Sequence, residues 1–256
     1  MKFATNAETM RAVNEVFSGF VEEAMWRFSE KGLHIGGIEQ AHVSMVVVEL
    51  DKEAFDMYDV PSGQFSTMYD MGVDIDKFKD ILEVVRKGSR MYFEHDEDRN
   101  RLAISFDNLT RRMSLIDTMG MDDPKVPDFR YDCRFKIKRD ELLRVVNAAT
   151  DVSDCISLTA NPDYLFIEAA GVGAGEDNIE AVFTKDMLGL YEVPKDAKAP
   201  PKSTFNLENI RHGVYSAPAG AELTVMYSDR YPVRMECQFA YGKGRILHLT
   251  APRFES

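Results

Sequence analysis

The sequence has little of what builds a disulfide framework or a metal centre. Only three of its 256 residues are cysteines, and Cys133, Cys155 and Cys237 are far apart, with no CxxC pair. An odd number of dispersed cysteines in apolar, strand-like stretches predicts buried, reduced thiols in a reducing compartment. The five histidines are also scattered, without HExxH or other metal-ligand spacing. They are His34, His42, His95, His212 and His248.

Long apolar runs are missing too. No window approaches the roughly 18 uninterrupted apolar residues of a membrane span. The first six residues reach polar side chains at once and lack the apolar region of a signal peptide. We therefore expect an intracellular protein with no membrane partner.

Positive charge is scarce as well. The chain has 31 Lys and Arg against 43 Asp and Glu, a net charge of −12. Phosphate binding usually shows as a basic domain. Any hypothesis of nucleic-acid binding must therefore account for this negative total.

Motifs of catalysis are weak. Residues 171–175 (GVGAG) are followed by acids instead of Lys and Ser or Thr, so a hairpin loop is favoured over a phosphate loop. Residues 94–98 (EHDED) favour a solvated turn over a metal site, because consecutive side chains converge poorly on one ion. Gly36 and Gly37 form no nucleophile elbow, and no Ser, His and acid set is recognisable. We expect no catalytic residues, no metal and no cofactor, although an enzyme with an unrecognised convergent site stays an alternative.

An internal duplication is the strongest pattern present. Residues 10–14 (MRAVN) recur 133 positions later as 143–147 (LRVVN), and both carry apolar residues at helical spacing. Residues 74–79 (DIDKFK) are matched 132 positions later by 206–211 (NLENIR). Asp74 and Asn206 are good N-caps, and apolar residues recur at three-residue intervals after each. The pattern predicts four equivalent helices.

Strands are expected after each helix. Several segments alternate apolar and polar residues, as half-buried strands do, with short polar turns between them. The chain is thus predicted to be four copies of a helix followed by an antiparallel meander, an α+β fold. The expected strands cover residues 24–29, 33–38, 43–50, 90–94, 101–106, 113–117, 155–160, 164–169, 179–184, 222–227, 233–239 and 246–250.

Two such copies make a domain of about 125 residues. Residues 120–128 hold two prolines, one glycine and three acids without periodicity, which is typical of an extended linker. We predict an N-terminal domain over 1–119, a linker over 120–130 and a C-terminal domain over 131–256. Residues 51–63 and 193–202 would interrupt the two domains at corresponding places.

Basic residues on the polar helix faces are candidates for a common role. Two positions recur across the duplication, because Arg11 matches Arg144 and Lys79 matches Arg211. An ordinary solvated helix face is the alternative for any single residue, and acids lie on the same helices. The candidate basic residues are Arg11, Lys77, Lys79, Arg144, Arg211 and His212.

The chain resembles a known family over its whole length. Residues 23–35 (EAMWRFSEKGLHI) and 38–46 (IEQAHVSMV) are similar to the proliferating cell nuclear antigen family, the sliding clamps of archaea and eukaryotes, and most like its archaeal members. Further segments match the same family in the same order along the chain: residues 71–74, 126–127 with 131–133, and 231–233 with 249–252. The resemblance implies the DNA-clamp fold: two similar domains, each with two helices on antiparallel sheet, assembled threefold into a pseudo-sixfold ring.

In such a ring the helices line the bore and the sheets continue across subunits. The resemblance therefore implies that the candidate basic residues of the four helices face DNA. The resemblance implies that the strand at 111–117 of one subunit joins the strand at 178–184 of the next. A sheet continued in this way leaves no open edge. The expected interface residues are Arg111, Arg112, Met113, Leu115, Ile179, Ala181 and Phe183.

The family also binds clients through a short peptide with apolar and aromatic anchors. The matching positions here are Ile38, His42, Met45, Val126, Pro127, Pro232, Leu249, Thr250, Ala251 and Pro252. Ile38, Met45 and Leu249 could instead be simple core residues. Pro124, Leu249 and Thr250 depart from the residues common in relatives, which affects client preference.

The resemblance implies double-stranded DNA as an encircled partner, bound without sequence specificity. It implies a homotrimer as the assembly, and DNA polymerase, clamp loader, flap endonuclease and ligase as clients. A subunit of a heterotrimeric replicative or checkpoint clamp is the alternative. A ring can hold DNA despite a net charge of −12, because leaving requires opening an interface or reaching an end.

Overall fold

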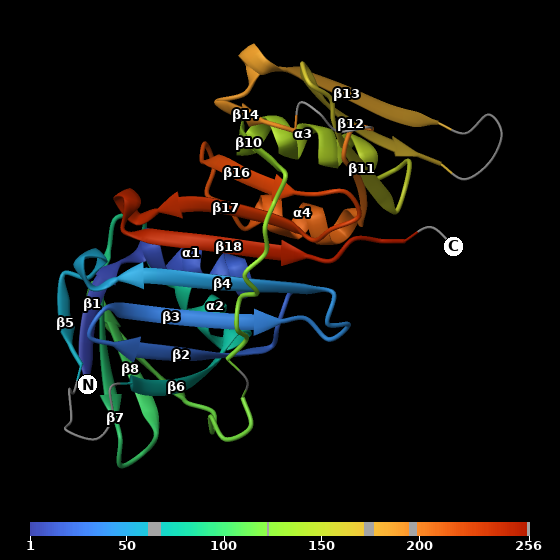
Figure 1. Ribbon diagram of the computed structural model, residues 1–256. Coiled ribbons are helices and arrows are strands. Elements are labelled where there is room, and N and C mark those ends of the chain that lie inside the picture. The colour runs from blue at the N-terminus through green and yellow to red at the C-terminus, as the bar shows by residue number, and fades with distance from the viewer. Residues whose placement is uncertain (61–67, 122, 172–176, 195–198, 255–256) are drawn as a thin grey trace. The chain divides into compact units, whose positions relative to one another are not determined.

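The chain divides into two compact units in the computed structural model, which describes residues 1–60, 68–121, 123–171, 177–194 and 199–254. The first unit comprises residues 1–125 and 238–246, and the second comprises 126–237 and 247–256. The residues predicted as a linker, 120–130, fall on both sides of the boundary between 125 and 126. Elements follow one another in the same order in both halves of the chain (Figure 1).

The first half contains two helices among its strands. These elements are β1 (Lys2–Asn6), α1 (Ala7–Phe17), β2 (Glu23–Ser29), β3 (Gly32–Ile38), β4 (Ser44–Asp51), β5 (Met57–Asp59), β6 (Met68–Asp74), α2 (Ile75–Val84), β7 (Arg90–Asp96), β8 (Arg101–Phe106) and β9 (Leu109–Ser114). A short 3-10 turn, Lys52–Ala54, follows β4.

The second half repeats this order. Its elements are β10 (Cys133–Lys138), α3 (Arg139–Ala149), β11 (Cys155–Ala160), β12 (Tyr164–Ala170), β13 (Asn178–Thr184), β14 (Leu190–Glu192), β15 (Lys202–Asn206), α4 (Leu207–Tyr215), β16 (Glu222–Tyr227), β17 (Val233–Phe239) and β18 (Gly244–Thr250). Short 3-10 turns follow β13 and β17. The expected α+β clamp fold built from four similar quarters is confirmed.

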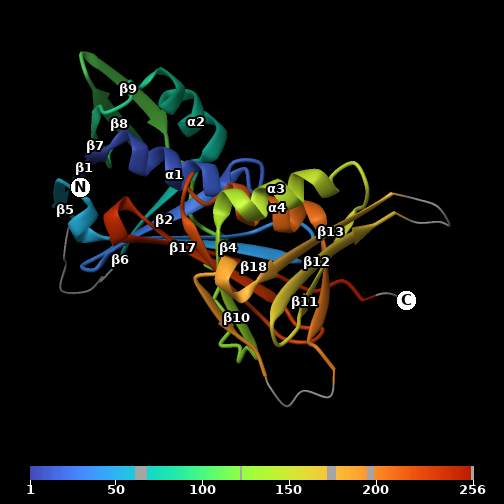
Figure 2. The same cartoon turned by 90° about the horizontal axis from the view of Figure 1, so that it is seen from above.

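Antiparallel strands support both helices of each unit. In the first unit the strand orders are β5-β1-β7-β8-β9 and β4-β3-β2-β6, and in the second β13-β12-β11-β15 forms a sheet of its own. Helix α1 contacts β1 and β4, and α2 contacts β6 and β9, so strands of both orders carry the helices. Figure 2 shows α1 beside α2 and α3 beside α4.

Helix starts follow the predicted caps. Asp74 accepts a 2.9 Å hydrogen bond from the Lys77 amide, and Asn206 accepts one of 3.2 Å from the Asn209 amide. Asn6 caps α1 in the same way, at 2.8 Å from the Thr9 amide. Each cap satisfies one backbone donor that the first helical turn leaves open. Lys138, before α3, makes no side-chain cap bond.

Aromatic side chains fill the core of the first unit. The rings of Phe3 and Phe93 stack with centroids 4.4 Å apart, and Trp26 meets Phe78 edge-on at 5.0 Å. Phe78 lies on the apolar face of α2, and Trp26 lies on β2 between β3 and β6. These contacts fix the helix to the strands by one face and leave its polar face to solvent.

Two expectations about strands were wrong. Each helix is preceded by a strand that the alternation did not reveal: β1, β6, β10 or β15. The strand expected at 113–117 is β9 at Leu109–Ser114. Its first four residues are all exposed, so apolar and polar side chains do not alternate there. The expected range was placed too late because only the buried Met113 and Leu115 fit an alternating pattern. Ile116 forms only a single bridge, to Gly72.

Candidate functional site

Two of the three candidate cations of the first unit, Arg11 and Lys77, are already engaged within the chain. Arg11 on α1 donates from Nη2 to the carbonyls of Leu82 (3.1 Å) and Val85, at the end of α2. Carbonyls at a helix end lack intrahelical donors, so Arg11 satisfies them and joins the two helices. Lys77 Nζ lies 2.7 Å from the Asp74 carboxylate, whose hydrogen bond raises the pKa of this lysine. Lys79 is exposed and has no ion pair within the described ranges.

The cations of the second unit also face carboxylates on their own helices. Arg144 Nη2 lies 2.9 Å from Glu141, and Arg211 Nη1 lies 3.2 Å from Glu208. Arg211 also covers the ring of Tyr215 at 5.1 Å from its centroid. All these side chains are accessible, so each pair stabilises the fold little. The polar helix faces therefore carry compensated charge instead of a strong positive field.

His212 lies in a different environment. Its ring is 5.7 Å from that of His248, which is fully buried on β18. Gly213 permits this approach: a Cβ there would lie 2.6 Å from His248 Nδ1 and 2.3 Å from Met235 Cε. A glycine inside a helix costs roughly 1 kcal/mol relative to alanine. The cost is offset here by close packing of α4 on the strands.

This histidine pair makes unfolding pH-dependent. Burial, and next the charge of His212, lowers the pKa of His248 from 6.5 to about 3. Between pH 6.5 and 3, His248 is protonated in the unfolded state and neutral in the folded state. The contribution of the neutral ring to the free energy of unfolding is therefore complete above pH 6.5 and is lost as the pH falls towards 3. The loss is on the order of a few kcal/mol.

We expect His248→Gln to flatten the dependence of unfolding free energy on pH between 7 and 4. The measurement is urea unfolding at fixed protein concentration, and the slope is compared instead of the absolute stability. An unaltered slope in His248→Gln would show that this ring does not cause the effect.

The predicted subunit-interface residues lie on two edge strands. β9 ends the order β5-β1-β7-β8-β9, and β13 ends the order β13-β12-β11-β15. Arg111 and Arg112 are exposed on β9, while Met113 and Leu115 are buried in the first unit. On β13, Ile179 and Ala181 are half-buried and point to the same side as the buried Phe183. Both edges thus offer an open backbone, and β13 also offers a partly covered apolar row.

The predicted client residues of the first unit surround the turn after β3. Ile38 is 36 % exposed and His42 is exposed, whereas Met45 is buried. The Glu39 carboxylate accepts hydrogen bonds from the amides of Ala41, Val43 (2.6 Å) and Ser44 (3.0 Å).

The same carboxylate fixes the conformation of this turn. Burial alone would raise the pKa of the Glu39 carboxyl, but the three amide hydrogen bonds outweigh it and lower the value. His42 adopts a left-handed conformation, with φ of 56°. The turn therefore presents Ile38 and His42 in a defined conformation.

The predicted client residues of the second unit differ in exposure. Val126 and Pro232 are half-buried and Pro127 is exposed, while Leu249 and Thr250 are buried. Ala251 and Pro252 are half-buried in the strand-free tail. Three aromatic residues near Pro127 and Pro232 in the sequence, which were not predicted as site residues, form a cluster of rings. Phe129 meets Tyr231 at 5.1 Å and Tyr131 at 6.2 Å.

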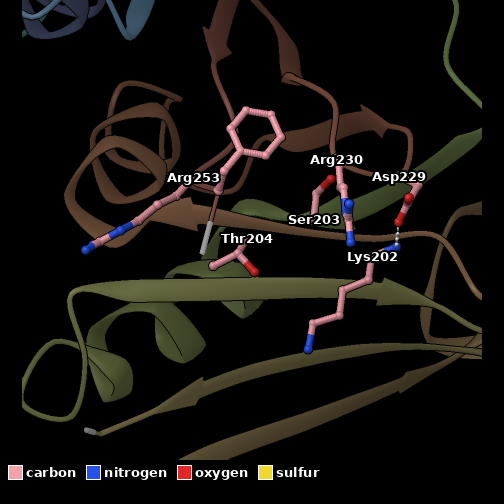
Figure 3. A pocket seen from close by; sticks show the side chains of 7 residues that line it. Lys202, Ser203, Thr204, Asp229, Arg230 and Arg253 are labelled. Carbon is pink, nitrogen blue, oxygen red and sulfur yellow. Dashed lines mark hydrogen bonds between the residues drawn. The ribbon is translucent and has the colours of Figure 1, made fainter. Parts of the chain in front are cut away.

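A cavity of about 400 Å³ adjoins the tail (Figure 3). The Arg253 amide donates to the Thr204 carbonyl at 2.7 Å, so the tail follows the free side of β15. The Lys202 amide donates to Asp229 at 3.2 Å, and Arg230 adopts φ of 53° in the same turn. The lining residues are Lys202, Ser203, Thr204, Asp229, Arg230, Arg253 and Phe254. The sequence marked only residues 228–230, as a turn.

The expectation of three buried thiols holds for two of them. Burial raises the pKa of Cys133 and of Cys237 to about 12. Cys155 is half-buried, and Arg253 Nη1 donates to its sulfur at 2.9 Å. The predicted hairpin loop at 171–175 lies almost wholly outside the described residues.

The described ranges contain no cluster of metal ligands and no membrane-spanning helix. No group of His, Cys, Asp and Glu there could hold a metal ion. Tyr69 bonds His95 Nδ1 and donates to Glu97 at 2.9 Å, so two of the acid-rich residues at 94–98 belong to a hydrogen-bonded turn. No described helix is long and apolar enough to cross a membrane.

Comparison with known proteins assigns the family. The family model for the N-terminal domain of proliferating cell nuclear antigen matches residues 2–123. The chain is 30 % identical to the DNA polymerase sliding clamp of Natronomonas pharaonis over 256 residues, covering 100 % of this chain and 99 % of that protein. The chain belongs to the DNA polymerase sliding clamp family.

Two further likenesses agree with this membership. The sliding clamp of Haloarcula marismortui is 30 % identical over 254 residues, with 98 % of this chain and 97 % of that clamp covered. The structure of Archaeoglobus fulgidus PCNA bound to the C-terminal region of FEN-1 superposes with a TM-score of 0.87 at 25 % identity. It covers 100 % of this chain and 99 % of that one. The expected likeness to archaeal clamps is thus confirmed.

Proposed function

We propose that this protein is one subunit of a ring that encircles duplex DNA and tethers DNA polymerase and other replication enzymes to it. The observation that carries the proposal is the fourfold repetition of a strand, a helix and a meander in a chain similar along its whole length to sliding clamps. A repeated unit with an open edge at β9 and another at β13 suits closed assembly from identical parts.

The assembly is a homotrimer in this proposal. β9 of one subunit continues the sheet of the next through β13, which leaves no open edge in the finished ring. Exposed Arg111 and Arg112 on β9 and exposed Glu180 on β13 give the two strands opposite charge. Because both complementary edges occur on one chain, a second copy is a sufficient partner. The interface residues are Arg111, Arg112, Met113, Leu115, Ile179, Ala181 and Phe183.

DNA is retained by closure more than by affinity. The helix cations would face the phosphates, but Arg11, Lys77, Arg144 and Arg211 each already have a partner in the chain. Ordinary DNA binding gains affinity by neutralising phosphates and is weakened steeply by salt. A ring needs only weak contacts, which also permit sliding. The negative total charge suppresses adhesion to other DNA.

Clients bind through a short peptide motif. The C-terminal region of FEN-1 is bound to PCNA in the Archaeoglobus fulgidus structure. The corresponding residues here are Ile38, His42, Met45, Val126, Pro127, Pro232, Leu249, Thr250, Ala251 and Pro252. Exposed apolar side chains and a tail of extended backbone suit aromatic anchors and main-chain hydrogen bonds. Polymerase, clamp loader, flap endonuclease and ligase are the client classes.

Tethering is the whole mechanism. A client bound to the ring meets DNA again at an effective concentration on the order of millimolar for a short linker. The chain makes or breaks no bond in this role, so it acts without catalysis or cofactor. The compartment in which it acts, in this proposal, is the cytoplasm.

Retention on DNA of different topology tests the function. We expect the protein, loaded on nicked circular DNA by its clamp loader, to stay bound for many minutes and to leave within seconds of linearisation. The measurement is gel filtration of labelled protein before and after cutting at a single site. Blocking both ends with bulky protein should restore retention. Equal retention on circular and open linear DNA would contradict encirclement.

A further inference from the structure

An ion-paired anchor holds the start of the interdomain segment on the first unit. Asp123 follows β9 by nine residues and lies among side chains of β2 and β3. Its Oδ2 pairs with Arg27 Nη1, and its Oδ1 lies 2.9 Å from His34 Nε2. The two carboxylate oxygens are thus held by two different strands.

Arg27 is fixed independently of Asp123. Its Nε and Nη2 bind the two oxygens of Asp70 on β6 at 2.9 and 3.0 Å, a bidentate pair. The hydrogen bond that the guanidinium donates to Asp70 raises the pKa of Arg27. A bidentate pair fixes the plane of an arginine. Nη1 therefore points to Asp123 from a preorganised position.

Pro124 adds an apolar contact to this anchor. A Cβ at Gly36 would lie 2.7 and 2.8 Å from two ring carbons of Pro124, so only glycine at this position lets the ring lie against β3. Arg27, His34 and Asp123 are all more than half-buried, with 23 %, 33 % and 29 % of their side chains exposed. Their charges are consequently screened less than those of a surface pair.

We propose that Asp123, held by Arg27 and His34, is a positioning residue for client binding. Val126 and Pro127 follow it by three and four residues, so fixing Asp123 and Pro124 limits the conformations open to them. A segment ordered in advance loses less entropy when a client peptide binds. The inference rests on the proposed function, because it assumes that Val126 and Pro127 contact the peptide.

Asp123→Asn removes the charge while keeping the side-chain shape. We expect it to weaken binding of a FEN-1 C-terminal peptide about 3- to 10-fold, the effect of a modest loss of preorganisation. Hydrogen exchange at residues 123–130 should accelerate, with the trimer mass and melting temperature unchanged. Calorimetry and exchange mass spectrometry on the full-length protein give these readouts.

Three further variants sharpen the test. Gly36→Ala displaces Pro124 without changing any charge and should act in the same direction. Asp123→Glu keeps the charge and should restore most of the affinity. Asp128→Asn is the matched control, an exposed acid of the same segment with no hydrogen bond or ion pair in the described structure, and it should bind as the unmodified protein does.

The outcomes separate the two proposals. If the unmodified protein binds the peptide and Asp123→Asn binds it equally well, the positioning role is wrong and the clamp function stands. If Asp128→Asn weakens binding as much as Asp123→Asn, net charge and not the anchor is responsible. If the unmodified protein binds no client peptide, the proposed client site fails, and this inference fails with it.

Discussion

Ala181→Glu is expected to convert the ring into monomers. Ala181 is half-buried on the edge strand β13, on the same side as the core residue Phe183. In a sheet continued by the β9 strand of a neighbour, this position becomes enclosed. A carboxylate enclosed without a partner costs roughly 3–5 kcal/mol. We therefore expect each interface to weaken at least about 100-fold.

Light scattering during gel filtration measures this change. The mass should fall from about three times the 29.1 kDa of the chain to a single copy, and retention on circular DNA should disappear. Val182→Glu provides the control, because Val182 lies on the opposite, exposed side of the same strand. A trimer that survives Ala181→Glu would exclude β13 from the interface. A protein that is monomeric without any substitution and assembles only with other chains would indicate a heterotrimer.

Val126→Asp is expected to abolish client binding while leaving the ring intact. Val126 is half-buried and Pro127 beside it is exposed, in a segment with no strand or helix of its own. An apolar anchor point replaced by a charge at the centre of a small interface costs about 2 kcal/mol or more, which corresponds to at least about 30-fold in affinity.

Titration with the FEN-1 C-terminal peptide checks this expectation. Val126→Ile keeps the apolar surface and should bind within about threefold of the unmodified protein. The trimer mass should be the same in all three proteins. If Val126→Asp instead dissolves the ring, the residue belongs to the assembly and the assignment of the client site is wrong.

The architecture could be predicted because the two halves of the chain repeat the same sequence patterns. Helix α1 and helix α3 share a sequence pattern, and Asp74 and Asn206 cap α2 and α4 as expected. Local signals of this kind survive in a single sequence. The strands before the helices were missed because each has only five to seven residues and runs directly into a helical pattern.

The edges of the sheets were harder to predict for a physical reason. An edge strand such as β9 is exposed on most of its length, so its residues do not alternate. Its position depends on pairing with β8, in which Ala103 is opposite Arg112. Pairing between distant residues leaves no trace in local composition.

The candidate site shows the same limit more strongly. Arg11 was predicted from its place on a polar helix face, but its bonds to the carbonyls of α2 depend on how two helices pack. The contacts of Asp123 with Arg27 and His34 join residues 96 and 89 positions apart. Gly213 inside α4 is a local signal of close packing, since helices rarely hold glycine without a reason.

The carboxylates beside the helix cations have a consequence for movement along DNA. In the proposed ring, an Arg144 that faces a phosphate would exchange the Glu141 carboxylate for another anion instead of gaining a first partner. Passing to the next phosphate reverses the exchange at nearly the same energy. The four amphipathic helices would then offer the double helix a surface of low friction, over which translation and rotation meet only shallow barriers.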